Sequence, residues 1–250
     1  MGATDQAPSG VRLETFAGLF EALAREGLSA VVIGGCAVGV YARRVEAAVL
    51  SQDLDLYMTE SGLEALLGAS TPLGLVVEQR PRPRSLPVAV LRWQGLEVNV
   101  LTATQGLPPA EVVMRAAREV VLGDMTEPIL IADAADLLRN KLAVNREKDR
   151  PHIELLRRFL DEEVVHAFRT ERAPRARLAP ADRLLAVLGA KTLDAELGAR
   201  LVGLAQTATD FRFLAHRLPT RALVEALAAR APSTDLRALV EAVAEARNLA

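Results

Sequence analysis

Two aspartates that alternate along a predicted strand constrain this chain more than any other feature. The segment from Ser51 to Leu56, SQDLDL, alternates polar and apolar residues, and alternate side chains of a strand project from the same face. We therefore expect Asp53 and Asp55 side by side, with Leu54 and Leu56 in the core. Adjacent carboxylates repel each other, and a divalent cation is the usual reason for such an arrangement. Oxygen ligands suit Mg²⁺ or Mn²⁺.

A pair of glycines follows an earlier predicted strand. Ser29 to Ile33 is a short β-branched run that ends at Gly34-Gly35, which is typical of a buried strand entering a turn. Glycines between a strand and a helix expose backbone N–H groups that suit phosphate oxygens. Ser51 adds a hydroxyl that could reach the same phosphates. Because Mg²⁺ keeps coordination positions for substrate phosphates, the two motifs together predict a nucleotide ligand.

Each motif taken alone has a simpler explanation. A lone D-x-D is more often a solvated strand end, and a lone Gly-Gly is more often a plain turn. The combination is more specific, because a strand, a glycine turn and a helix precede the Ser-x-Asp-x-Asp strand in that order. A scaffold with a coincidental D-x-D stays open as an alternative. It would not hold Asp53 and Asp55 close to Gly35.

The predicted elements indicate an α+β front half and an all-helical back half. Alternation and turn residues predict strands at Ser29–Ile33, Leu54–Met58, Leu73–Gln79, Val88–Trp93 and Leu96–Leu101. The last two flank Gln94-Gly95, which predicts an antiparallel hairpin. We expect a core over residues 1–131, helices over 132–177 that close a nucleotide cleft, and a helical bundle over 178–250.

Helical periodicity occurs in both halves. Helices are expected at Val11–Glu26, Ala37–Arg44, Glu60–Leu67, Ala132–Val144, Pro151–Leu160 and about 180–188, 194–206, 219–230 and 233–247. Pro180 and Pro219 stand at expected first-turn positions and Ser233 at an expected N-cap. The basic stretch from Arg169 to Pro180 is expected to be a linker.

Composition excludes several classes of function. The net charge is −2, so no overall field favours nucleic acid or an anionic membrane. Cys36 is the only cysteine, which excludes an internal disulfide and a cysteine-based zinc site. The first ten residues do not resemble a signal peptide, and the longest apolar stretch, Ala30 to Ala42, is too short to cross a bilayer. We expect a cytoplasmic protein without a membrane partner.

The glycine and aspartate motifs together resemble a known signature. Gly34-Gly35, the helix with Tyr41 and Arg43-Arg44, and the segment Ser51–Leu56 look like the DNA polymerase β-type nucleotidyltransferase superfamily. The nearest group is that of the AbiEii-type toxin nucleotidyltransferases. A second, weaker match is Leu138–Ala143 with the charged residues after it, which is similar to the family's helix whose lysine faces the triphosphate. The resemblance covers roughly residues 11 to 160.

The resemblance implies a nucleotidyltransferase-fold mixed sheet with flanking helices and a magnesium-dependent activity. A nucleoside monophosphate would pass from an NTP to an acceptor hydroxyl, with pyrophosphate leaving and two metal ions assisting. Asp53 and Asp55 would bind the metals, and Lys141 would neutralise charge on the leaving oxygens. The nucleotide contacts implied are Gly34, Gly35, Ser51, Arg44, Lys141 and Arg146. Family acceptors include RNA, proteins and small molecules, and a toxin–antitoxin pairing with a cognate regulatory protein is a family-level implication.

One expected carboxylate is missing. The family has a third carboxylate on a neighbouring strand, and alignment places it at Asn99 within Leu96–Leu101. An amide oxygen can coordinate a cation but cannot act as a base. Glu97 lies two residues earlier on the same face and could replace it as a metal ligand and catalytic residue. Three hypotheses stay open. Glu97 substitutes, or the chain is a weakened nucleotide-binding or interaction module, or the carboxylate comes from elsewhere because another strand pairing holds.

Overall fold

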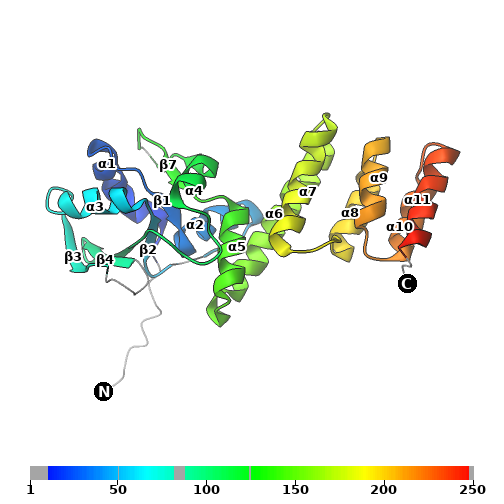
Figure 1. Cartoon of the computed structure of the whole chain (residues 1–250). Coiled ribbons are helices and arrows are strands. Elements are labelled where there is room, and N and C mark those ends of the chain that lie inside the picture. Colours follow the sequence, from blue (N-terminus) through cyan, green and yellow to red (C-terminus); the bar gives the residue numbers. More distant parts are fainter. Residues whose placement is uncertain (1–10, 50, 82–87, 124, 248–250) are drawn as a thin grey trace, which may run out of the picture. The chain divides into compact units, whose positions relative to one another are not determined.

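The chain divides into two compact units, residues 1–159 and 160–250. The computed structural model describes residues 11–49, 51–81, 88–123 and 125–247. In this described part, the first unit holds a seven-stranded mixed sheet with its helices, and the second is built from helices (Figure 1). The predicted α+β class, with an α+β front half and a helical back half, is therefore confirmed.

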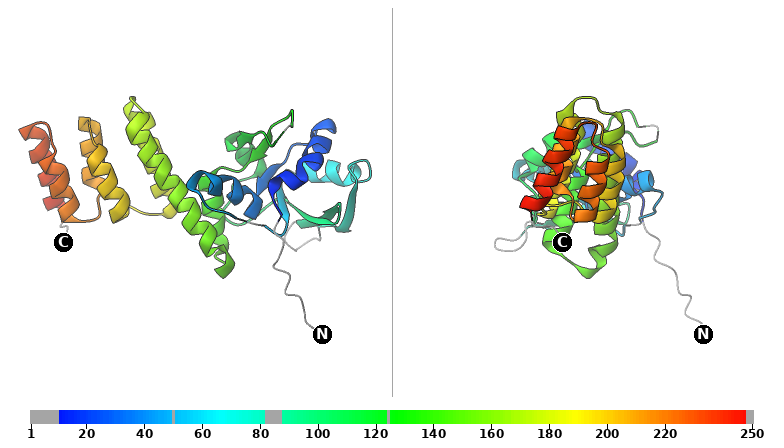
Figure 2. Two further views of the ribbon diagram at one scale, coloured as in Figure 1. Left: turned by 180° about the vertical axis from the view of Figure 1, so that it is seen from behind. Right: turned by 90° about the vertical axis from the view of Figure 1, so that its right-hand side faces the viewer.

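The first unit alternates short strands and helices. Its elements, where η denotes a 3-10 helix, are η1 (Leu13–Phe16), α1 (Ala17–Arg25), β1 (Val31–Ile33), α2 (Gly34–Ala42), η2 (Arg43–Val45), β2 (Leu54–Tyr57), α3 (Glu60–Gly68), β3 (Leu75–Gln79), β4 (Val88–Trp93), β5 (Leu96–Leu101), α4 (Ala110–Ala116), β6 (Arg118–Val120), β7 (Ile129–Ile131), α5 (Ala134–Val144), η3 (Glu147–Asp149) and the start of α6 (Arg150–Thr170). The five predicted strands are present as β1 to β5. In the view from behind, the blue helices of this unit lie in front of the strands (Figure 2).

The strand order in the sheet is β3-β4-β5-β2-β1-β7-β6. β2 lies at the centre, where it pairs antiparallel with β1 and parallel with β5. The register places Asp55 beside Ile33 on one side and beside Asn99 on the other. Since Gly34 follows Ile33, the sheet brings the glycine turn, the aspartates and Asn99 to one place.

One face of the sheet forms the core of the unit. Along β4 and β5, buried residues alternate with half-buried ones, as expected for an antiparallel pair with one covered face. Trp93 packs from the covered face against Phe16, with ring centroids 6.1 Å apart. Asn99 belongs to the half-buried set. The core therefore leaves the other face accessible for polar groups.

The hairpin between β4 and β5 forms as predicted. Gln94 and Gly95 have φ angles of +50° and +83°, which is the pattern of a type I′ turn. All six residues of β4 then pair with β5. The two-residue turn thus fixes the register that places Asn99 beside Asp55.

Helix α5 is tied to the sheet by polar contacts. Asp133 caps its N-terminus by accepting from the Ala135 N–H at 2.8 Å. The buried Asn140 donates to the Thr104 hydroxyl at 3.1 Å and to the Gln105 carbonyl at 2.7 Å, just beyond the end of β5. These bonds hold the face of α5 that carries Lys141 toward the strand that carries Asn99.

The second unit is a series of helices. They are α7 (Pro174–Leu188), α8 (Ala195–Leu204), α9 (Ala208–Arg217), α10 (Arg221–Ala229) and α11 (Thr234–Ala246), preceded by the end of α6. Ser233 caps α11 as predicted, accepting from the Leu236 N–H at 3.2 Å. Buried leucines, valines and Phe211 line the inner sides of the helices.

Several predictions for the helical half were wrong. The expected linker from Arg169 to Pro180 is mostly helical, because α6 continues to Thr170 and α7 begins at Pro174. Pro180 lies inside α7 rather than in a first turn. Pro219 precedes the Thr220 N-cap of α10 and so lies outside that helix.

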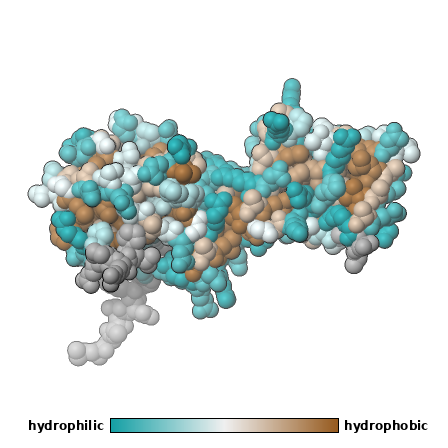
Figure 3. Space-filling view, viewed as in Figure 1, coloured by the Kyte–Doolittle hydropathy of each residue, from teal (hydrophilic) through white to brown (hydrophobic). Residues whose placement is uncertain are grey.

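Membrane-spanning segments are not found among the described helices. None of them is both long and apolar enough to cross a bilayer. The face seen in Figure 3 mixes polar and apolar residues over both units.

Candidate active site

Three side chains meet where β2 and β5 lie side by side. The Asn99 amide nitrogen donates to Asp53 Oδ2 at 3.0 Å and to Asp55 Oδ1 at 3.2 Å. Asp53 lies just before β2 and Asp55 within it, so both carboxylates project to the half-buried face. The predicted juxtaposition is thus present, and the amide bridges the two acids.

Electrostatic strain is concentrated on Asp55. Burial, and then the neighbouring Asp53 charge, raise the pKa of its carboxyl to about 6, against the hydrogen bond from Asn99. A single neutral amide therefore does not offset the repulsion between the two carboxylates. A bound cation would do so.

The glycine turn lies in direct contact with these groups. Gly34 has a φ of +68°, and a Cβ placed there would overlap the Asp55 carboxylate. A Cβ on Gly35 would stand 2.6 Å from the Ser51 hydroxyl oxygen. Ser51 in turn donates to Asp53 Oδ1 at 3.2 Å. Only residues without a side chain permit this approach, so the glycines and the aspartates form one structural unit.

A basic cluster stands on α5 and the turn after it. Lys141 is 4% exposed, and its Nζ donates to Asp149 Oδ1 at 2.8 Å. Arg146 donates through Nε to Asp149 Oδ2 at 2.7 Å. Asn145 ends α5 in the left-handed conformation, with a φ of +50°, and this reversal returns Arg146 and Asp149 toward Lys141. One buried carboxylate therefore fixes both cations.

The ionisation of this cluster follows from its contacts. Burial alone would raise the pKa of Asp149, but hydrogen bonds from Arg146 and Lys141 outweigh it and leave the pKa below its usual value. Burial, followed by the Lys141 charge, lowers the pKa of the nearby His152. This basic cluster thus consists of two cations, one carboxylate and one imidazole that favours its neutral form.

The acidic residues beside β2 and the basic cluster on α5 and its turn line one hollow of about 520 Å³. Of the predicted site residues, the hollow collects Gly35, Ser51, Asp53, Asp55, Asn99, Lys141 and Arg146. Lys148, Asp149 and His152 add polar surface, and Val88 and Leu101 add an apolar part. Acidic groups on the sheet and basic groups on α5 and its turn thus share one space. Its volume is in the range of ligand pockets.

Two predicted site residues lie elsewhere. Glu97 pairs across the hairpin with Arg92, with 3.9 Å between Arg92 Nη2 and Glu97 Oε2, and it does not line the hollow. Arg44 is exposed on η2 and is likewise outside the lining. The structure therefore brings neither of them to the aspartates.

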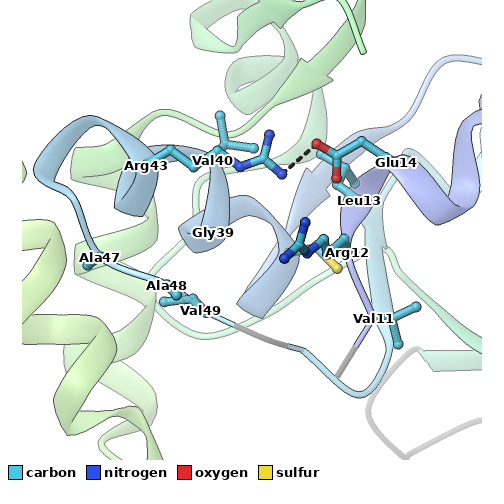
Figure 4. A pocket seen from close by; sticks show the side chains of 11 residues that line it. Val11, Arg12, Leu13, Glu14, Gly39, Val40, Arg43, Ala47, Ala48 and Val49 are labelled. Carbon is cyan, nitrogen blue, oxygen red and sulfur yellow. Dashed lines mark ion pairs between the residues drawn. The ribbon is translucent and has the colours of Figure 1, made fainter. Parts of the chain in front are cut away.

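A smaller hollow of about 280 Å³ lies beside α2 (Figure 4). Arg43 and Glu14 form an ion pair across it with 2.5 Å between nitrogen and oxygen. Cys36 also lines it and donates through Sγ to the Asp53 carbonyl at 3.3 Å. Burial, and then the Asp55 charge, raise the pKa of this thiol to about 12, which disfavours the nucleophilic thiolate.

The donor set near β2 fits one hard divalent cation. Asp53 and Asp55 supply carboxylate oxygens within reach of a single amide, and rotation of that Asn99 amide would present its oxygen instead. Mg²⁺ needs few protein ligands when substrate phosphates supply others. In the described part of the chain, no group of three or more His, Cys, Asp or Glu residues is arranged to hold a metal, so a metal here would depend on two acids and the ligand.

Asp149 lines this hollow, and it is one of the charged residues after Leu138–Ala143 to which the sequence patterns gave no role of its own. The usable signal was Lys141 on the apolar side of a helix, because a buried ammonium needs a counter-charge nearby. Asp149 lies in the 3-10 turn that follows that helix. A search of this turn for an acid would have found it.

Comparisons with known proteins give structural similarities only. The sequence matches no protein-family profile and no curated protein. ANT(2″)-Ia, solved with adenylyl-2″-tobramycin, is 16% identical over 68% of this chain and 96% of its own, with a TM-score of 0.42. A protein from Thermotoga maritima assigned as a nucleotidyltransferase is 20% identical over 60% and 92%, with a TM-score of 0.38.

A nucleotidyltransferase-like antigen from Paracoccidioides brasiliensis is 14% identical over 87% of this chain and 99% of its own, with a TM-score of 0.35. None of these three structures belongs by name to the AbiEii-type group, so that narrower assignment stays a prediction. The three solved structures named here are described as an antibiotic-resistance protein bound to an adenylylated antibiotic, a protein assigned as a nucleotidyltransferase and a nucleotidyltransferase-like protein.

Proposed function

We propose that this chain is a metal-dependent nucleotidyltransferase that moves a nucleoside monophosphate from an NTP to an acceptor hydroxyl. The observation that carries the proposal is the hollow in which Asp53 and Asp55 face Lys141 and Arg146. A polyphosphate bound through a cation would neutralise the charges on both sides of the hollow. The cation would offset the negative carboxylates, and the phosphates would offset the positive side chains of Lys141 and Arg146.

Each group has a role in this proposal. Asp53 and Asp55 would hold Mg²⁺ or Mn²⁺, which when bound would coordinate triphosphate oxygens and offset charge on the leaving pyrophosphate. Lys141 and Arg146 would bind those oxygens from the opposite side, already oriented by Asp149. The Gly34-Gly35 backbone and the Ser51 hydroxyl would contact phosphate beside the carboxylates.

A second candidate function follows from Asn99. Its amide donates to both acids and cannot take a proton from an acceptor, while Glu97 is turned toward Arg92. This arrangement favours a nucleotide-binding or interaction module with weak or no transferase activity. In either function the acceptor, RNA, protein or small molecule, is unassigned, and a cognate regulatory partner and a cytoplasmic location stay predictions.

Pyrophosphate release separates the two candidates. Wild type, Lys141→Gln and Asn99→Asp would be incubated with ATP, GTP, CTP or UTP and Mg²⁺, with RNA, protein or small-molecule fractions as acceptors. Release by wild type that falls about 100-fold in Lys141→Gln, as expected for a group that stabilises developing charge, supports the transferase. Release only by Asn99→Asp supports the weakened module. Absence of release from all three proteins contradicts transfer.

A further inference from the structure

Basic side chains gather in a hollow of the second unit. This hollow, of about 760 Å³, lies in the helical unit and is lined by Lys191, Arg212, Arg217 and Arg247, together with Phe213. No Asp or Glu is among its lining residues in the described part of the chain. The unit as a whole is balanced, with 13 Lys and Arg against 12 Asp and Glu over residues 160–250. The positive charge is therefore a local feature of the hollow.

Two of the four cations are held in place by backbone carbonyls. Arg247 donates to the Ala215 carbonyl at 2.7 Å and to the Leu218 carbonyl at 2.9 Å, at the end of α9. Arg217 donates to the Lys191 carbonyl at 3.3 Å. Backbone carbonyls at a helix end carry only about half an elementary charge, so they orient a guanidinium and leave much of its field in place.

Carboxylates contribute little to the hollow. The acid that approaches is Asp182, which stands 3.9 Å from Arg217 and has a side chain that is 59% exposed. The Arg217 guanidinium also lies 5.8 Å from the Phe213 ring centroid, which restrains it further. Burial, followed by the Arg217 charge, lowers the pKa of Arg247. Like charges are thus held close together, an arrangement that a bound anion would stabilise.

Lys191 and Arg212 differ from Arg217 and Arg247 in their exposure to solvent. Both side chains are exposed, and neither forms an ion pair with another described residue. Rigid guanidinium groups bind phosphate oxygens in pairs, and a lysine adds a mobile point charge. Several cations spread over a wide, open surface suit a chain of phosphates better than one compact anion.

We propose that this hollow binds the sugar-phosphate backbone of an RNA strand. The site is separate from the nucleotide site in the first unit and does not depend on a metal. Binding would be insensitive to sequence, because charge rather than base-edge contacts carries it. Four phosphate contacts predict that log K falls with log[NaCl] with a slope of about −3, since each contact to a single strand contributes about 0.7.

The test measures binding of a fluorescein-labelled 20-nucleotide single-stranded RNA to the full chain by anisotropy, between 25 and 200 mM NaCl with EDTA present. Lys191→Gln/Arg212→Gln should bind about tenfold more weakly at 50 mM NaCl and lose about 1.4 from the slope. The matched control, Arg200→Gln/Arg221→Gln, removes two arginines of the same unit that pair with Glu162 and Glu225 outside the hollow. It should bind within twofold of wild type.

Several results would overturn the proposal. Absence of RNA binding by wild type would do so, as would an equal loss of binding in the control variant. Complete competition by polyglutamate would indicate an acidic protein partner instead. Complete displacement by 1 mM ATP or inorganic phosphate would indicate a small anion. Because EDTA removes divalent metal, and because the two variants differ from wild type only in the second unit, their comparison reports on this hollow rather than on a metal-bound nucleotide. A failed nucleotide site would not change its outcome.

Discussion

Gly34 has a φ of +68° and lies against Asp55, so that an added Cβ would overlap the carboxylate. Gly27 has a φ of +66°, yet a Cβ there meets nothing within 4 Å. The two glycines therefore share their backbone conformation and differ only in the close approach. A substitution at each separates backbone strain from contact with the site.

Gly34→Ala should destabilise the fold by about 3 kcal/mol or more, because the left-handed conformation costs about 1–2 kcal/mol and displacing a packed group adds about 1–3 kcal/mol. Gly27→Ala should lose only the conformational cost. Urea denaturation of both variants gives the comparison. Equal losses would show that Gly34 does not approach Asp55 as closely as the structure places it.

Asp149 provides the second residue-scale prediction. Asp149→Asn removes the charge that Arg146 and the buried Lys141 share, and it should cost about 3–5 kcal/mol at pH 7. Since the pKa of Asp149 is lowered in the fold, its stabilisation is present above the unfolded value of about 3.9 and is lost as pH falls through the lower folded value. The difference between wild type and variant should shrink as pH falls from 5 toward 2.

Denaturation in urea at several pH values measures this difference. Glu162→Gln, which removes one member of an exposed pair with Arg200, is the control and should change stability by no more than about 0.5 kcal/mol. A loss in Asp149→Asn that stays constant down to pH 2 would show that the effect does not come from the carboxylate charge.

Residue patterns predicted the acidic half of the site and missed part of the basic half. Period-two alternation was enough to place Asp53 and Asp55 together, and the hairpin register placed Asn99 beside them. The orientation of Asn99 toward both acids depends on side-chain geometry, which no spacing rule encodes. The pairing of Asp149 with Lys141 depends on a left-handed turn at Asn145, although a buried lysine already indicates that a counter-charge lies nearby.

At the scale of elements, α7 contains a proline where a helix disfavours one. Pro180 lies at the seventh position of α7, whereas Pro174 lies at the first. A proline in a helix interior removes a hydrogen bond and crowds the preceding turn, but one in the first turn costs nothing of that kind. Substitution by alanine should therefore change the stability of the fold differently at the two prolines.

Pro180→Ala should raise stability by about 1–2 kcal/mol, because relief of an interior cost of about 3 kcal/mol is reduced by about 1 kcal/mol through the more flexible unfolded chain. Pro174→Ala should be neutral or slightly destabilising. Differential scanning calorimetry of the two variants provides the measurement. A lower melting temperature for Pro180→Ala would contradict the regular helix described for α7.

Long periodic elements were predicted better than short ones. The strands β2 to β5 and the helix α5 carry clear alternation or periodicity. Strand β1 has three residues, and the β-branched run that ends at Gly34-Gly35 predicted it. Strands β6 and β7, also of three residues each, were missed, as was α4. Helix α9 had a readable signal, because Thr207 and Asp210 form a capping box at its start, but its polar residues obscured the apolar side.

At the scale of the whole molecule, the two units carry hollows of different charge. The first unit combines carboxylates with basic side chains in one hollow. In the second unit, the described lining of a hollow carries three arginines and a lysine but no Asp or Glu. The net charge of −2 concealed that second feature, since a balanced total says nothing about clustering. The finer subdivision of the chain at residues 131 and 177 stays a prediction.

The most direct test of the account is thermal unfolding of the full chain with each NTP, with and without Mg²⁺ or Mn²⁺. Wild type would be compared with Asp53→Asn/Asp55→Asn. The account predicts that an NTP at 100 times its dissociation constant stabilises wild type by about 2.7 kcal/mol, that this requires the metal, and that the double variant loses it. Stabilisation that is independent of metal, or that the double variant retains, would contradict the site, as would no stabilisation by any NTP.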